Sequence, residues 1–173
     1  GTMTRAETRH TVTVEDMTLK LGAVIDEQGG CIRNDGNLTL SRVNVELCKV
    51  SGAYSGGGIY SADMTNLTLS NSRVFGNQAF AGGGISAEGN ISIADSRIES
   101  NTSTGSNGGG LSLHHFGNTA WIADTVITGN WSNGSGGGIL GTIFALTTVE
   151  SGMERSIVRA MGVSLAAWYL VFF

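Results

Sequence analysis

Two aspartates in the middle of the chain have the clearest capacity for chemistry. Asp95 in the stretch IADSRIESN and Asp124 in the stretch IADTVITGN hold the same place in two similar segments. If such segments stack as strands of a sheet, the two carboxylates lie about 5 Å apart. That separation suits the two acids of a retaining glycosidase or, with Ca²⁺, a polysaccharide lyase. The competing interpretation is a structural corner, because Asn71 and Arg42 hold the same place in earlier segments and no third carboxylate converges there.

Paired arginines and histidines offer further candidates. Arg73 and Arg97 recur at one place in the similar segments, so we expect them to stack on an outer face. They could bind an acidic sugar or form a solvated face, since like charges one repeat apart repel only modestly in water. His114 and His115 have no carboxylate or cysteine in their own motif, which argues against a metal or catalytic role. We therefore expect no fixed metal site and no cofactor, and nothing further in the sequence supports Ca²⁺.

The chain has two cysteines, Cys31 and Cys48, which are too few for a disulfide framework and match no zinc spacing. Cys31 stands where similar segments have glycine, and Cys48 stands where they have asparagine. We expect two buried free thiols rather than a bridge between two different corners.

The composition indicates one ordered, β-rich domain. The chain has 173 residues with 27 glycines and no proline, whereas disordered low-complexity chains are usually rich in both. Charged residues make up 14% of the chain and the net charge is −4. No basic face of the kind that attracts phosphate backbones is expected, so nucleic acid is excluded as a partner.

A glycine motif recurs along the chain as GGCI, GGGI, GGGI, GGGL and GGGI. The apolar residues that end these motifs are 27, 26, 26 and 28 positions apart, which is typical of stacked repeats. No Lys-Ser/Thr pair follows the glycines and no helical pattern begins there, which argues against a phosphate-binding loop. We expect tight corners at the glycines Gly57, Gly83, Gly109 and Gly137.

Each repeat carries a second motif, nine residues long, which aligns without gaps in LSRVNVELC, LSNSRVFGN, IADSRIESN and IADTVITGN. Its third position holds Asn71, Asp95 and Asp124, and its ninth holds Asn77, Asn101 and Asn130. Asparagine and aspartate tolerate left-handed backbone, and stacked amides can hydrogen-bond along a column. We predict structural corners at both positions and an asparagine ladder at the ninth.

Short alternating segments predict the strands. Residues 38–40 and 67–69 read LTL, residues 91–93 read ISI, and the segments after each glycine motif and around Val74 or Ile98 are similar. A repeat of about 27 residues then holds three short strands, which bury their inward aliphatic side chains only when coils stack. The predicted fold is an all-β parallel β-helix of about five coils.

The repeats divide the chain into three parts. Residues 1–11 form a tail or the start of a truncated array, residues 12–140 form the β-helix, and the repeat fades over residues 141–173. From Ser151 the pattern becomes helical, with a capping box to Glu154 and an apolar face. This segment is either a helix that caps the stack or unrelated trailing sequence, because WYLVFF is apolar on every side.

The connections between the ninth position and the next glycines vary, reading KVSGAYS, QAFA, TSTGSN and WSNGS. Variable insertions in a solenoid project from one edge, which is a natural place for recognition. Tyr54, Phe80 and Trp131 are the aromatic residues at this edge, so they are the predicted ligand-binding residues.

These repeats resemble a known group of proteins. GGGI followed by an aliphatic-x-x-Asn, as in Val74-Phe75-Gly76-Asn77, is similar to the GGA[ILV] and FxxN repeats of polymorphic outer-membrane proteins and of bacterial right-handed parallel β-helix surface proteins. The resemblance covers about residues 12–140. It implies a right-handed helix and a protein exported to the cell surface or the outside, and it supplies no fixed catalytic residues.

Three functions follow as expectations. The first is a non-enzymatic surface or secreted protein that binds a carbohydrate or a surface or matrix protein through the variable edge, with membrane association only through flanking segments. The second is a polysaccharide lyase or glycoside hydrolase using Asp95 and Asp124. The third is a purely structural stalk.

Overall fold

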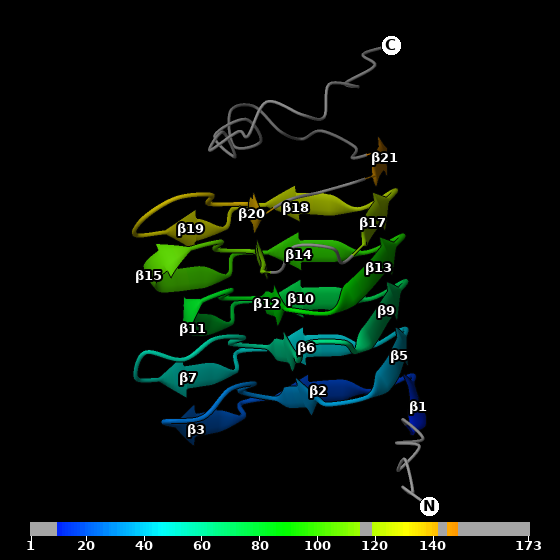
Figure 1. The fold of residues 1–173 in the computed structure, drawn as a ribbon, viewed down its shortest axis with the longest axis horizontal. Helices are drawn as coiled ribbons and strands as arrows, with labels where there is room; N and C mark the ends of the chain where they lie inside the picture. Colours follow the sequence, from blue (N-terminus) through cyan, green and yellow to red (C-terminus); the bar gives the residue numbers. More distant parts are fainter. Residues whose placement is uncertain (1–9, 115–118, 142–144, 149–173) are drawn as a thin grey trace, which may run out of the picture.

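The computed structural model describes residues 10–114, 119–141 and 145–148. These residues form a stack of about five coils whose strands all pair in parallel, a β-solenoid (Figure 1). The all-β parallel fold expected from the repeats is confirmed. The helical cap predicted from Ser151 lies outside the described residues.

Four parallel sheets, here named A to D, run along the stack. Sheet A contains β1 (Thr11–Glu15), β5 (Asn37–Ser41), β9 (Asn66–Ser70), β13 (Asn90–Ala94), β17 (Ala120–Ala123) and β21 (Ala145–Thr148). Sheet B contains β2 (Thr18–Lys20), β6 (Asn44–Glu46), β10 (Arg73–Phe75), β14 (Arg97–Glu99) and β18 (Val126–Thr128). Sheet C contains β3 (Ala23–Ile25), β7 (Lys49–Ser51), β11 (Gln78–Ala81), β15 (Thr102–Asn107) and β19 (Trp131–Ser132). Sheet D contains β4 (Ile32–Asn34), β8 (Ile59–Ser61), β12 (Ile85–Ala87), β16 (Leu111–Leu113) and β20 (Ile139–Gly141).

Each complete coil therefore has four strands, and the prediction of three was wrong. The additional strands are those of sheet C, which consist of the connections that vary in sequence. Backbone amides and carbonyls can pair whatever the side chains are. The stacked connections therefore form strands although their sequences show no alternation of apolar and polar residues.

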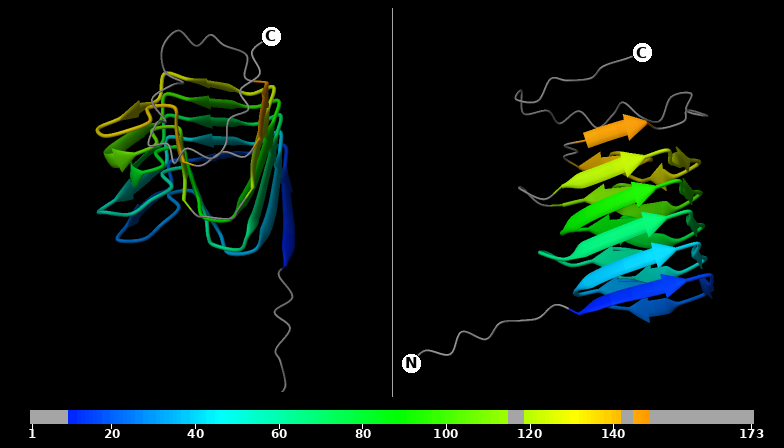
Figure 2. Two further views of the ribbon diagram at one scale, coloured as in Figure 1. Left: turned by 45° about the horizontal axis from the view of Figure 1, so that its top comes forward. Right: turned by 90° about the vertical axis from the view of Figure 1, so that its right-hand side faces the viewer.

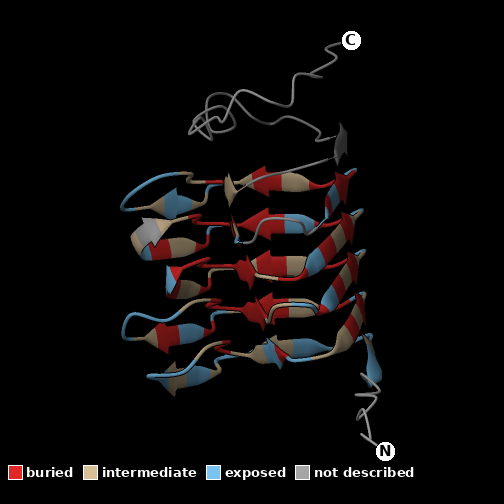
Figure 3. Cartoon of the chain, viewed as in Figure 1, coloured by how far each residue is buried: buried red, intermediate tan, exposed pale blue. Residues whose placement is uncertain are grey.

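The main core lies between sheets A, B and D and is built from columns of equivalent aliphatic residues. In sheet D, Ile59, Ile85 and Leu111 follow one another in register and are fully buried. In sheet A, Leu40, Leu69 and Ile93 do the same, and sheet B adds a third column (Figure 3). The strand motifs thus place apolar side chains inward once per coil, as the alternation predicts.

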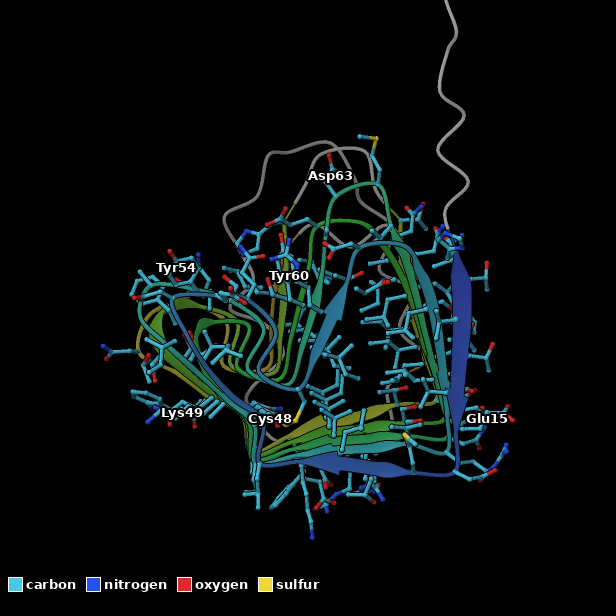
Figure 4. The ribbon with its side chains drawn as sticks, turned by 90° about the horizontal axis from the view of Figure 1, so that it is seen from below. Glu15, Cys48, Lys49, Tyr54, Tyr60 and Asp63 are labelled. Atoms are coloured by element: carbon cyan, nitrogen blue, oxygen red, sulfur yellow. A yellow bond between two sulfur atoms is a disulfide. The ribbon has the colours of Figure 1, made fainter. Side chains whose placement is uncertain are left out.

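Sheet C and the segments that lead from it back to the glycines form a projection that we call the side lobe (Figure 2, left; Figure 4). The returning segments also stack, through the bridges Ser55 to Ala81 and Asn107 to Ser135. Val50, Ala79 and Ser103 are buried in the lobe and do not belong to the main core cluster. Ser103 is fully buried, and its hydroxyl donates to the carbonyl of Phe80 at 2.6 Å, so this variable connection is a packed element.

The glycine motifs join the lobe to sheet D, and the first and second glycines of each motif have different structural roles. The first glycine of each motif has left-handed backbone, with φ of 74° at Gly56 and 57° at Gly82. The second glycines, the predicted corners Gly57, Gly83, Gly109 and Gly137, lie one position further along. A Cβ at Gly83 would be 2.3 Å from the carbonyl oxygen of Thr102, so this position needs glycine for close backbone contact between coils.

Candidate functional site

The stacked aspartates lie at the outer corner between sheets A and B. Asp95 and Asp124 follow β13 and β17, have φ of 48° and 45°, and are exposed. Asn71 has the same left-handed conformation one coil earlier, with φ of 49°. Arg42, at the equivalent place in the first complete motif, donates two hydrogen bonds to Asp16 at 2.6 and 2.8 Å. The column thus contains residues of three charge types, which share backbone conformation.

Nothing at this corner gathers further catalytic or ligating groups among the residues that the structure describes. No set of three or more His, Cys, Asp or Glu side chains suited to a metal occurs in that part of the chain. Asp95 and Asp124 therefore have the geometry of solvent-facing corner residues.

The ninth-position asparagines form a ladder, as predicted. The side-chain Oδ1 of Asn101 accepts hydrogen bonds from the backbone N–H and the Nδ2 of Asn77, both at 3.0 Å. Asn130 accepts the corresponding pair from Asn101, each at 2.9 Å. Each Nδ2 also donates to a carbonyl of an earlier coil, and Asn77 and Asn101 are fully buried. The left-handed residue at this corner is the one before the asparagine, such as Gly76 with φ of 65°.

A second ladder, of hydroxyl groups, was missed by the sequence reasoning. It runs through the fourth position of the nine-residue motif, where Ser72, Ser96 and Thr125 are buried. Each hydroxyl accepts a hydrogen bond from the backbone N–H one coil before it, at 3.0, 3.1 and 3.4 Å. The alignment contained this signal, because three successive repeats have Ser or Thr there.

Cys31 and Cys48 form a disulfide with a Cα–Cα distance of 5.6 Å, so the expectation of free thiols was wrong. The other coils show the reason. A Cβ added at Gly58 would lie 3.0 to 3.1 Å from the amide group of Asn77, and Gly84 faces Asn101 in the same way. The third glycine and the ninth-position asparagine of one coil are therefore neighbours that close it. Cysteine replaces both members of this pair in one coil, so the two sulfur atoms meet.

The arginines on sheet B belong to an ion network. Arg73 donates to Glu99 at 2.9 Å and lies 3.7 Å from Glu46, and Arg97 donates to the other oxygen of Glu99 at 2.7 Å. The guanidinium of Arg73 also lies 4.0 Å from the ring centre of Phe75. Although burial opposes ionisation of Glu99, the hydrogen bonds from Arg97 and Arg73 outweigh it and lower its pKa. Both arginines are thus matched by glutamates on their own face.

The histidine pair is only partly described. The Nε2 of His114 lies 2.5 Å from the hydroxyl of Ser112, whose residue is fully buried. His115 lies outside the described residues. Tyr60 lies two strands from Ser112 in sheet D and is buried, and burial raises its pKa to about 12, helped by Glu88.

The predicted ligand-binding aromatics all lie on the side lobe and are exposed. Tyr54 is 37% exposed, Phe80 is 39% exposed and Trp131 is 54% exposed. The backbone N–H of Phe80 donates to the carbonyl of Tyr54 at 3.0 Å, so these two come from adjacent coils. Trp131 begins β19 and pairs with Thr102 of β15. Figure 4 shows Tyr54 and Lys49 on the lobe, away from the main core.

The described residues contain no helix of the length and hydrophobicity that crossing a membrane requires. Comparison of this chain with protein-family models, with curated proteins and with solved structures finds no match.

Proposed function

We propose that this chain is a non-enzymatic, exported binding module whose side lobe contacts a carbohydrate or a surface or matrix protein. The observation that carries the proposal is that Tyr54, Phe80 and Trp131, three exposed aromatic side chains, all lie on the side lobe. Exposed aromatic residues are the side chains most enriched at binding surfaces. The connections that form the lobe also vary in sequence while the core columns repeat.

The disulfide supports export. Disulfides persist in oxidising compartments such as the periplasm and the outside of the cell, and they are rare in the cytosol. The bond between Cys31 and Cys48 is therefore easier to reconcile with an exported protein. The likeness of the glycine and asparagine motifs to right-handed outer-membrane repeats points to the same location.

We favour binding over hydrolysis because of where Asp95 and Asp124 lie. Asp95 and Asp124 are exposed on an outer corner, whereas catalytic acids need surroundings that hold a substrate. Turnover of a polysaccharide that is abolished by Asp124→Asn would contradict the proposal.

A glycan array and a panel of extracellular matrix proteins test the lobe directly. We expect the wild-type protein to bind a member of these panels and Trp131→Ala to weaken that binding at least about tenfold, since a central tryptophan typically contributes this much or more. The control is Leu47→Ala, which removes an exposed apolar side chain between β6 and β7, outside the lobe aromatics. If Trp131→Ala weakens binding to no member of either panel, the lobe site is contradicted, and no binding at all on either panel leaves a structural stalk as the alternative.

A further inference from the structure

The outer face of sheet A is uncharged over its three central strands. Inward residues such as Leu38 and Leu40 alternate with outward ones in β5, and β9 and β13 repeat the pattern. The nine outward residues are Asn37, Thr39, Ser41, Asn66, Thr68, Ser70, Asn90, Ser92 and Ala94. By contrast, sheet B carries Glu46, Arg73, Arg97 and Glu99 on its outer face. These three strands therefore offer a neutral face to a partner, and the outward Glu15 of β1 lies at its edge.

The central outward residues form a column of hydroxyl groups along the solenoid axis. Thr39, Thr68 and Ser92 follow one another in register, and Thr13 continues the column into β1. Their hydroxyls have no hydrogen-bond partner in the described part of the chain, so they are free to donate and accept. Neighbouring strands of a sheet are about 4.8 Å apart, so the column presents one hydroxyl per step of that length.

A parallel column of amides lies two residues away and is held in one orientation. Asn66 Nδ2 donates to Asn37 Oδ1 at 2.7 Å, and Asn90 Nδ2 donates to Asn66 Oδ1 at 3.0 Å. The backbone N–H of Thr119 donates to Asn90 Oδ1 at 2.8 Å. Because an amide has two N–H groups and each of these donations uses one, Asn66 and Asn90 each keep an N–H for a ligand.

The hydroxyl column ends at an aromatic side chain. Trp121 pairs in register with Ser92 and is 38% exposed, while its neighbours Ala120 and Ile122 are buried. The face therefore combines hydroxyl groups, oriented amides and one indole ring on strands whose backbone is fixed by the sheet.

We propose that this face binds a neutral, extended polysaccharide whose chain lies along the solenoid axis. A sugar ring stacks on Trp121, and the following sugars hydrogen-bond to Ser92, Thr68 and Thr39 and to the neighbouring amides. The step between coils is close to the length of one sugar unit in an extended β-linked chain, so each coil meets one sugar of the ligand. The lack of charge on the face favours a neutral glycan over an acidic one, since an acidic chain needs paired cations. The inference concerns a different face from the side lobe and does not rest on the lobe.

Depletion of the protein from solution by solid polysaccharides tests the inference. The probes are microcrystalline cellulose and chitin, both neutral, with a polygalacturonate gel as the acidic comparison. We expect wild-type protein to be retained on a neutral solid and not on polygalacturonate. Retention should change little when salt is raised to about 0.5 M, because ion pairs are screened there and neutral contacts are not.

Two variants and one control locate the binding face. Trp121→Ala and Thr68→Asp should each weaken retention at least about tenfold, whereas Leu47→Ala, which removes an exposed side chain between β6 and β7, should leave it unchanged. Circular dichroism and the melting temperature establish that each variant is folded, and Trp121 is exposed, so its loss leaves the core intact. No retention of the wild type on either neutral solid overturns the inference. Retention that depends on Trp131 and not on Trp121 overturns it as well, and then supports the lobe instead.

Discussion

At the residue scale, buried asparagines join consecutive coils through side-chain and backbone atoms at once. Asn101 accepts two hydrogen bonds from Asn77 and donates to Val74 and Asn130. Such groups are costly to leave unpaired, because a buried donor without a partner loses its hydration without compensation. The ladder therefore contributes most to the free energy of unfolding where its amides are most deeply buried.

We expect Asn101→Ala to lower the free energy of unfolding by about 3 kcal/mol, because it leaves the buried N–H of Asn77 and the carbonyl of Val74 without these partners. Urea denaturation measures the change. The matched control is Asn90→Ala, which breaks an exposed amide ladder and should cost less than about 0.5 kcal/mol. Equal losses in the two variants would show that burial does not decide the strength of a ladder.

A second residue-scale prediction concerns Glu99. Its pKa is held below the ordinary glutamate value of 4.5 by Arg97 and Arg73, although burial opposes this. The folded state thus takes up the proton less readily than the unfolded state, so the stabilisation is complete above that ordinary value and is lost as the pH falls through the lowered one. Glu99→Gln should reduce the melting temperature at neutral pH, and the difference from the wild type should shrink as the pH falls below the ordinary glutamate value.

Thermal unfolding followed by circular dichroism across this pH range checks the prediction. Glu27→Gln, which changes an exposed acid after β3, is the control and should have little effect at any pH. If the difference in melting temperature between Glu99→Gln and the wild type stays constant with pH, ionisation of Glu99 is not its cause.

At the element scale, each coil closes where the third glycine meets the ninth-position asparagine. The Cys31–Cys48 disulfide is a covalent version of this contact, and it links residues 17 positions apart. A bridge of this span is worth about 3 kcal/mol in the chain-entropy model. Reduction should therefore destabilise the wild-type protein.

The double variant Cys31→Gly/Cys48→Asn restores the pair found in the other coils. We expect it to fold, to extend the ladder by one amide onto Asn77, and to have a melting temperature that does not respond to dithiothreitol. Cys31→Ser/Cys48→Ser has neither the bond nor the amide and should melt lower. If the two double variants melt at the same temperature, the asparagine does not substitute for the bridge.

The element scale also shows what sequence patterns can and cannot predict. Columns such as Ile59, Ile85 and Leu111 recur at a fixed interval and alternate with polar residues, so the period alone indicates a stacked core. Sheet C has no such pattern, because its strands are held by backbone hydrogen bonds over small buried residues such as Ala79 and Ser103. The disulfide was not predicted for a related reason. Its two corners are far apart in the repeat but adjacent in space, and no local sequence pattern indicates that they are adjacent.

The side lobe and the outer face of sheet A also differ in how readily the sequence predicts them. The exposed aromatics of the lobe stand out in the sequence because they interrupt polar connections. The neutral face of sheet A is visible only once the register aligns Thr39, Thr68 and Ser92 in one column. A surface that is built by repetition along the solenoid axis can be recognised only after the register of the strands is known.

At the scale of the whole molecule, coils touch only their neighbours, so stability depends on position along the stack. The strand β1 has a partner on one side among the described strands, and its residues Thr11–Thr13 are exposed. The strands β9 and β13 lie in the middle and have partners on both sides. In such an array the terminal coil opens at the lowest cost, because it breaks one interface and leaves the others intact.

Native-state hydrogen exchange followed by mass spectrometry reports this gradient. We expect amide protection to be lowest in β1 to β3 and to rise through β5 to a maximum in β9 and β13. The disulfide between Cys31 and Cys48 lies just beyond the first strands, so reduction should move the boundary of fast exchange inward toward Asn77. Asn101→Ala should instead raise exchange in the central coils, because it weakens an interface in the middle of the stack. Uniform protection from β1 to β13, unaffected by either change, would mean that the solenoid opens as a single unit and that its coils do not act as separable neighbours.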